Sequence, residues 1–163
     1  MRDIARDNYF MSAAIEEAKK CALLDEVPVG AVIVRDNKII ASSGNGRETF
    51  KDATFHAETE AISNACRYLG GWRLVGCELF VTLEPCIMCG GAIINARVPE
   101  VIIGARDPKA GAFGSLCDLN SLHVNHHPNI TFGVMEEECA DLLRQFFREK
   151  RERGKRWKKM NNE

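Results

Sequence analysis

Residues 79–96 read LFVTLEPCIMCGGAIINA and hold the clearest strand-to-helix transition in the chain. The first part, 79–83, is almost entirely apolar, which is typical of a buried strand. The second part, 86–96, is rich in small and apolar residues and predicts a short helix that stops before Pro99. A strand that leads directly into a helix is the building unit of sheets covered by helices. The stretch therefore indicates an α/β protein whose sheet is partly parallel.

The segments on both sides continue this alternation. Asp7 or Asn8 can cap an amphipathic helix, and a tight turn at Asp36–Asn37 joins two apolar runs into a hairpin. Residues 106–128 predict an irregular surface loop with one helical turn near Leu116. The expected helices are 8–24, 56–69, 86–96 and 136 to about 153, and the expected strands are 29–34, 39–42, 79–83, 101–104 and 130–134.

The chain has 163 residues, of which 45% are hydrophobic and 28% charged. This length fits one domain with a core that needs no disulfide staples, and the composition excludes a largely disordered chain. No run approaches the roughly 20 apolar residues of a membrane span, and the N-terminus lacks the apolar segment of a secretory signal. Seven cysteines, set mostly in apolar or helical patterns, favour free or metal-bound thiols in a reducing cytoplasm.

The formal net charge of -1 averages over two unlike parts of the chain. Residues 148–159 carry eight basic and two acidic side chains, a charge of +6, so the remainder carries -7. We therefore expect one domain over residues 1–150, followed by a basic C-terminal tail over 151–163. Such a tail is either an RNA-binding element or a solubilising end.

Two short motifs carry the chemistry. The first is His56-Ala57-Glu58, and the second is Pro85-Cys86-Ile87-Met88-Cys89. Cys86 and Cys89 are three residues apart at the start of the predicted helix, where unpaired backbone N–H groups favour thiolates. His56 lies at the start of its own helix, so both helix N-termini can meet at one end of the sheet.

Two thiolates and one imidazole form a set of three zinc ligands. Catalytic zinc sites have three protein ligands and leave one position for water, whereas structural sites usually have four. Glu58 is too near His56 to be a second ligand without strain, but it is well placed to move a proton beside the metal. A thioredoxin-like redox function is disfavoured, because it leaves His56 and Glu58 without a role.

The H-x-E and P-C-x-x-C pair is the signature of zinc-dependent deaminases. The wider pattern resembles the bacterial tRNA-specific adenosine deaminases, within the cytidine and deoxycytidylate deaminase superfamily, from about residue 8 to 150. The matching segments are 27–32 (VPVGAV), Asn45, 72–74 (WRL), 81–89 (VTLEPCIMC), 104–111 (GARDPKAG), Gly114–Ser115, Asn125–His126, Leu142–Leu143 and 146–148 (FFR).

This resemblance implies a three-layer α/β/α cytidine-deaminase-like fold with a central mixed five-stranded sheet. It also implies a cytoplasmic homodimer with one zinc ion per subunit, which converts the wobble adenosine of a tRNA anticodon stem-loop to inosine. Its carried-over zinc ligands are His56, Cys86 and Cys89, with Glu58 as the proton shuttle. The carried-over substrate-binding residues are Asn45, Asp107, Lys109, Asn125, Phe147 and Arg148.

Three residues depart from the family pattern. Ala53 replaces a proline, and this change should be mild. Phe55 replaces an alanine beside His56, so its ring could either reshape the pocket wall or pack into the core. Phe113 is larger than the small residue expected before Gly114.

Two other functions remain open at this point. The same zinc chemistry serves deaminases of a free base or nucleotide, such as guanine, cytosine or deoxycytidylate. The basic tail argues against them, because a small substrate offers it no row of phosphates. The second is a non-catalytic zinc-stabilised RNA-binding domain, against which Glu58 argues, since a structural site does not need it.

Overall fold

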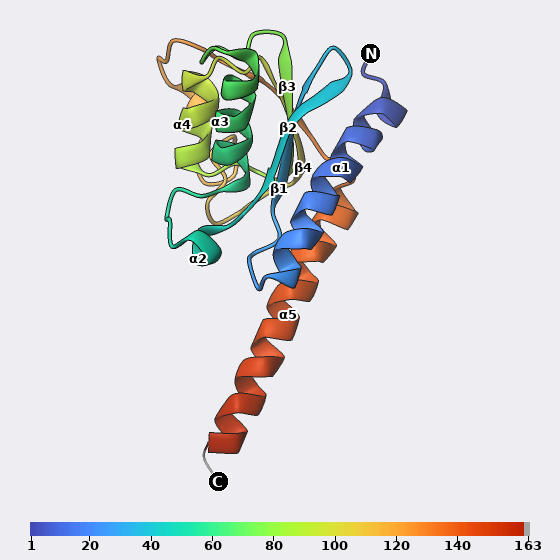
Figure 1. The fold of residues 1–163 in the computed structure, drawn as a ribbon, viewed down its shortest axis with the longest axis vertical. Helices are drawn as coiled ribbons and strands as arrows, with labels where there is room; N and C mark the ends of the chain where they lie inside the picture. The colour runs from blue at the N-terminus through green and yellow to red at the C-terminus, as the bar shows by residue number, and fades with distance from the viewer. Residues whose placement is uncertain (162–163) are drawn as a thin grey trace.

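A computed structural model describes residues 1–161 and has five strands in one sheet (Figure 1). The strands are β1 (Gly30–Arg35), β2 (Lys38–Gly44), β3 (Cys77–Leu83), β4 (Glu100–Ala105) and β5 (Asn129–Phe132). The helices are α1 (Ile4–Leu23), α2 (Arg47–Phe50), α3 (Ala57–Leu69), α4 (Ile87–Asn95) and α5 (Glu136–Asn161), with a 3-10 turn η1 (Leu119–Ser121).

The sheet has the order β2-β1-β3-β4-β5 and is mixed. β1 pairs antiparallel with both β2 and β3, and the register shifts once between Ile33 and Val34. β3, β4 and β5 run parallel, with Leu79 opposite Val101 and Ile102 opposite Thr131. The carboxyl ends of the parallel strands therefore lie at one end of the sheet.

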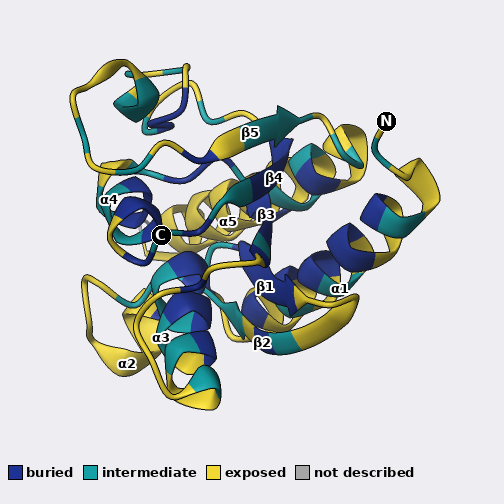
Figure 2. Ribbon diagram, turned by 90° about the horizontal axis from the view of Figure 1, so that it is seen from above, coloured by how far each residue is buried: buried dark blue, intermediate teal, exposed yellow. Residues whose placement is uncertain are grey.

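Alternation along the central strands divides the core between the two faces of the sheet. Side chains such as Ile33 and Val81 pack with α3 and α4 on one face. Their neighbours in sequence, such as Val32 and Phe80, pack with α1 and α5 on the other. The central strands are the most deeply buried part of the molecule (Figure 2). This arrangement confirms the three-layer α/β/α fold with a central mixed five-stranded sheet.

Three local predictions need correction. α1 begins at Ile4, because the Asp3 side chain caps it by accepting a hydrogen bond from the Arg6 backbone N–H. Asp7 lies inside the helix, buried in ion pairs with Arg2 and Arg6. The one-turn helix α2 was not predicted, since its four residues are all exposed and carry no apolar period. The helical turn of the 106–128 loop lies at η1 (Leu119–Ser121), not at Leu116, because the Asp118 side chain caps it there.

The last helix is longer than predicted. α5 does not end near Arg153 but continues to Asn161 and extends away from the rest of the molecule (Figure 1). Lys, Arg and Glu are good helix formers, and Gly154 costs only about 1 kcal/mol within a helix. Most of the expected tail is thus helical, and its residues 162–163 lie outside the described part of the chain. Within residues 1–161, no helix is long and apolar enough to cross a bilayer.

Candidate metal centre and active site

Two helix N-termini meet at the carboxyl ends of β3 and β4. Cys86 is the N-cap of α4, and Cys89 lies in its first turn. His56 is the N-cap of α3, and its backbone N–H donates to the Thr59 hydroxyl at 3.2 Å. Pro85 lies just before the α4 cap rather than inside the helix. The predicted convergence of the two motifs is confirmed by this arrangement.

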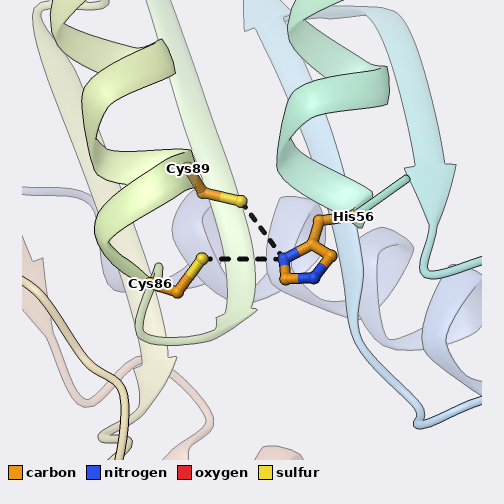
Figure 3. A group of neighbouring side chains, drawn as sticks. All are labelled: His56, Cys86 and Cys89. Atoms are coloured by element: carbon orange, nitrogen blue, oxygen red, sulfur yellow. Dashed lines mark hydrogen bonds between the residues drawn. The ribbon is translucent and has the colours of Figure 1, made fainter. Parts of the chain in front are cut away.

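His56, Cys86 and Cys89 form a group that can hold a metal ion. Their ligand atoms all lie within 4.8 Å of one another. The Nδ1 atom of His56 is 3.7 Å from the Cys86 sulfur and 3.4 Å from the Cys89 sulfur, and all three side chains point toward a common centre (Figure 3). Two soft sulfurs and one imidazole nitrogen are ligands that zinc prefers.

The two thiols are strongly coupled. A hydrogen bond from Cys89, together with the contact to His56, lowers the pKa of Cys86 to about 4. The neighbouring Cys86 and burial together raise the pKa of Cys89. The lowered pKa of Cys86 favours its thiolate form, which is the form that binds a metal.

Glu58 lies in the first turn of α3, with only 4% of its surface exposed. Burial raises the pKa of this carboxyl to about 7, although hydrogen bonding to its own backbone N–H and the nearby His56 oppose the shift. A pKa near neutrality lets a carboxyl both accept and donate a proton under physiological conditions. Glu58 lies outside the group of His56, Cys86 and Cys89, and its role as a proton carrier stays a prediction.

A pocket of about 160 Å³ opens directly above this group. Its lining combines the ligands His56 and Cys86 with Glu58 and with residues from four segments, which follow α1, β2, β3 and β4. The other lining residues are Val27, Val29, Asn45, Arg47, Ala57, Leu83, Glu84, Asp107 and Ala110. The Asn45 amide donates to the carbonyl of Val27 at 3.2 Å, so it also braces the wall in which it lies.

A wider groove of about 800 Å³ continues from the pocket, with which it shares Val27, Leu83 and Asp107. Lys109, Phe147 and Arg148 line it, together with Arg106, Pro108, Leu143, Arg144 and Arg151. Five cationic side chains and one carboxylate make it strongly positive.

Asn125 does not line either cavity. It is exposed on the loop beside His126, whose ring hydrogen-bonds to the Val98 carbonyl, before the start of β4. That position is at the end of the sheet opposite to the pocket. The structure of the single chain thus brings five of the six predicted substrate-binding residues to the pocket and groove, and leaves Asn125 apart.

Two buried carboxylates near the pocket were not singled out from the sequence. Glu84 accepts hydrogen bonds from the backbone N–H groups of Asp107, Phe113 and Ser115 and from the Ser115 hydroxyl. Glu26 accepts from the backbone N–H of Thr49. Each carboxylate holds a pocket-lining loop in place. A glutamate before Pro85 is part of the recognised motif, but nothing local to either residue reveals its distant partners.

The comparisons with known proteins agree over nearly the whole chain. A model of the MafB19-like deaminase family matches residues 5–151. A tRNA-specific adenosine deaminase from Bacillus subtilis is 47% identical over 153 residues, which cover 93% of this chain and 95% of the relative. The chain belongs to the tRNA-specific adenosine deaminase family.

Solved structures of two deaminases are similar to this chain. A structure from studies of tRNA:A34 deaminases, which edit A to I at the wobble position, is 45% identical with a TM-score of 0.81, and the match covers 83% of this chain and 99% of that one. A guanine deaminase from Bacillus subtilis is 41% identical with a TM-score of 0.58, covering 60% of this chain and 63% of that one. The likeness to the tRNA deaminase is the more complete.

The two aromatic departures from the tRNA-specific adenosine deaminase pattern pack outside the pocket lining. Phe55 stacks on Phe50, with ring centroids 4.2 Å apart, and both rings cover Gly46. Phe113 is buried against α4, where its ring lies 3.5 Å from the position a Cβ would take at Gly90. Neither Phe55 nor Phe113 lines the pocket.

Proposed function

We propose that this enzyme deaminates the wobble adenosine of a tRNA anticodon stem-loop to inosine by hydrolysis. Support comes above all from the match to a tRNA:A34 deaminase over 99% of that chain. The positive groove that adjoins the pocket supports the same substrate, because a free base or nucleotide has no extended row of phosphates to offer it.

His56, Cys86 and Cys89 would hold one zinc ion per subunit through Nδ1 and the two sulfurs. Zinc with three protein ligands supplies an activated water at neutral pH. The chain's own residues supply a pocket for the base, a proton carrier at Glu58 and polar side chains that can orient the base.

Glu58 is the proton carrier. Its carboxylate takes a proton from the attacking water and delivers it to N1 of adenine, which makes C6 more electrophilic. Glu58, again a carboxylate, then takes the second proton from the hydroxyl group now on C6 and passes it to the amine, so that the C6–N bond breaks and ammonia leaves. Its burial and its pKa of about 7 suit both steps. A purely structural zinc site with RNA-binding function would not require this residue.

The pocket would hold the target base after it leaves the loop stack. Extrusion costs a few kcal/mol and is least costly in a loop that is already single-stranded. Asn45 and Asp107 border the pocket, and Lys109, Phe147 and Arg148 border the groove beyond it. We assign these five residues to the target nucleotide and its neighbours. We assign Asn125 to a contact made outside this single-chain pocket.

The deciding experiment compares wild type with Glu58→Gln on total tRNA, with free adenosine, cytidine and guanine in parallel. We expect inosine at the wobble position from wild type only, and a rate loss of roughly 10²- to 10⁴-fold or more in the variant. Zinc content should be equal in both proteins, because Glu58 is not a ligand. Ammonia released only from free guanine or cytidine would refute the tRNA assignment, and an active Glu58→Gln would refute the proton shuttle.

We also propose that the enzyme is a cytoplasmic homodimer whose residues 1–150 form the deaminase domain, with 151–163 as a basic C-terminal extension. Exposed apolar side chains on α4 and in the loop between β4 and β5 support self-association. They include Ile87, Leu116 and Leu122, each more than half exposed. Light scattering of the purified protein tests the dimer directly.

A further inference from the structure

The distal half of α5 buries none of its side chains in the described part of the chain. Residues 147–161 are all exposed, and the helix extends beyond the α/β body into solvent (Figure 1). Its residues 151–159 include six basic side chains and one acidic one. Repulsion between these like charges destabilises the helix unless a negatively charged partner neutralises them.

Several basic side chains of α5 recur at the spacing of one helix face. Arg144, Arg148 and Arg151 line the groove beside the pocket. Continuing their alternating spacing of four and three residues along α5 leads to Lys155 and then Lys158. Side chains at such spacing share one helix face. We call Arg148, Arg151, Lys155 and Lys158 the groove-side stripe.

The opposite face of the same helix has different partners. Arg153 forms an ion pair with Asp25 in the turn after α1, and it lines a hollow there with Glu149 and Phe146. Within residues 1–161, no member of the groove-side stripe forms an ion pair with a carboxylate, whereas Arg144 is paired with Glu137 and Asp141. Lys150, Arg156 and Lys159 on the other faces also form no ion pair within residues 1–161. The groove-side stripe is therefore distinguished by its continuity with Arg148 and Arg151, which line the groove, and not by missing ion-pair partners.

We propose that the groove-side stripe binds consecutive backbone phosphates of the RNA stem next to the loop that enters the pocket. At 1.5 Å per residue, Arg148 to Lys158 spans about 15 Å, which is long enough to follow several phosphates from the groove outward. The inference rests on the proposed RNA substrate, and it adds that binding energy comes from a defined helix face beyond the pocket. RNA affinity should therefore depend on which face of α5 carries the basic side chains, and not only on the total charge of the helix.

Two triple variants with the same change in charge test this orientation. Arg151→Gln, Lys155→Gln and Lys158→Gln remove charge from the groove side. Lys150→Gln, Arg153→Gln and Arg156→Gln remove as much charge from the other faces of the same helix. Glutamine keeps high helix propensity, and circular dichroism checks that helix content is unchanged. Binding is measured from 50 to 200 mM salt with an intact tRNA and with a short single-stranded RNA that contains only the target and its immediate neighbours.

We expect the groove-side triple variant to weaken tRNA binding roughly 10- to 100-fold at 0.1 M salt and to reduce the slope of log K against log salt by about 2 to 3. The other triple variant and wild type should bind tRNA alike, and all three should bind the short RNA alike. Equal losses in both triple variants, or no loss in either, would overturn the proposal. Wobble deamination by wild type is scored separately, so failure of the proposed reaction is distinguishable from failure of the stripe.

Discussion

At the scale of single residues, three buried glutamates differ because their hydrogen-bond donors differ. Glu58, Glu26 and Glu84 are each 4% exposed or less. Burial dominates at Glu58 and raises its pKa. Burial also acts on Glu26 and Glu84, but hydrogen bonds from backbone N–H groups and hydroxyls outweigh it and lower both pKa values. The same residue type thus serves as a proton carrier in one place and as a charged anchor in two others.

Glu26 provides a test of anchoring that involves no group at the metal centre. Hydrogen bonds from Thr49 and from the backbone of Glu48 hold its pKa below the ordinary 4.5. Hydrogen bonds to a charged acceptor are worth more than those to a neutral one. We expect Glu26→Gln to lower the free energy of unfolding by about 1–2 kcal/mol at pH 7, measured by urea denaturation.

The pH dependence of this loss follows from the sign of the shift. A lowered folded-state pKa contributes stability above the unfolded pKa, and this contribution disappears as the pH falls through the folded value. The difference between wild type and Glu26→Gln should therefore be full at pH 7 and shrink as the pH falls below about 4.5. The matched control is Glu48→Gln, an exposed residue of the same segment, which should change stability by less than about 0.5 kcal/mol. A difference that stays constant with pH would contradict the charged anchor.

At the scale of elements, the backbone of α1 lies directly against β1 at Gly30. A Cβ at Gly30 would lie 1.9 Å from the Ala14 carbonyl oxygen and 2.6 Å from the Ala18 nitrogen. Both are backbone atoms of α1, so relief requires the whole helix to move. At this contact Phe10 and Met11 of α1 pack against the sheet. The short distance explains why the first residue of β1 is a glycine.

We expect Gly30→Ala to destabilise the protein by about 1–3 kcal/mol through overpacking, measured by urea denaturation. Gly154→Ala is the control, because a Cβ there meets nothing within 4 Å. That change should raise the helix content of α5, since alanine is favoured over glycine by about 1 kcal/mol in a helix. Unchanged stability in Gly30→Ala would show that α1 is free to shift on the sheet.

At the scale of the whole molecule, the ligand group joins the two helices of one layer. His56 lies at the start of α3, and Cys86 and Cys89 lie at the start of α4, so a bound ion would link segments 30 residues apart in sequence (Figure 3). A ligand that binds only the folded state stabilises it by about 4 kcal/mol at 1,000 times its Kd.

We therefore expect a zinc chelator to lower the thermal unfolding midpoint by roughly 10 °C and added zinc to restore it, as measured by calorimetry. Cys86→Ser should unfold early with or without chelator. Cys117→Ser, a partly exposed cysteine outside the ligand group, should behave like wild type. A chelator that strips the ion without moving the midpoint would argue against this structural link.

The sequence alone predicted what is encoded within a few residues. The apolar run of Leu79 to Leu83, the helix start at Cys86 and the spacing of the two motifs are local properties, and they predicted the fold class and the ligand group. The family followed from the matching segments between about residues 8 and 150. The hydrogen-bond and packing partners of Glu26, Glu84 and Phe113 lie far away along the chain and could not be read from local patterns.

Only the tertiary structure decided how distant segments meet. It brought Lys109 and Phe147 to one groove and left Asn125 at the other end of the sheet. It also extended α5 to Asn161, which places Arg148, Arg151, Lys155 and Lys158 on one face of the helix. The physical reason is that periodicity specifies which face of an element is apolar, whereas the packing of the layers specifies where the remaining faces point.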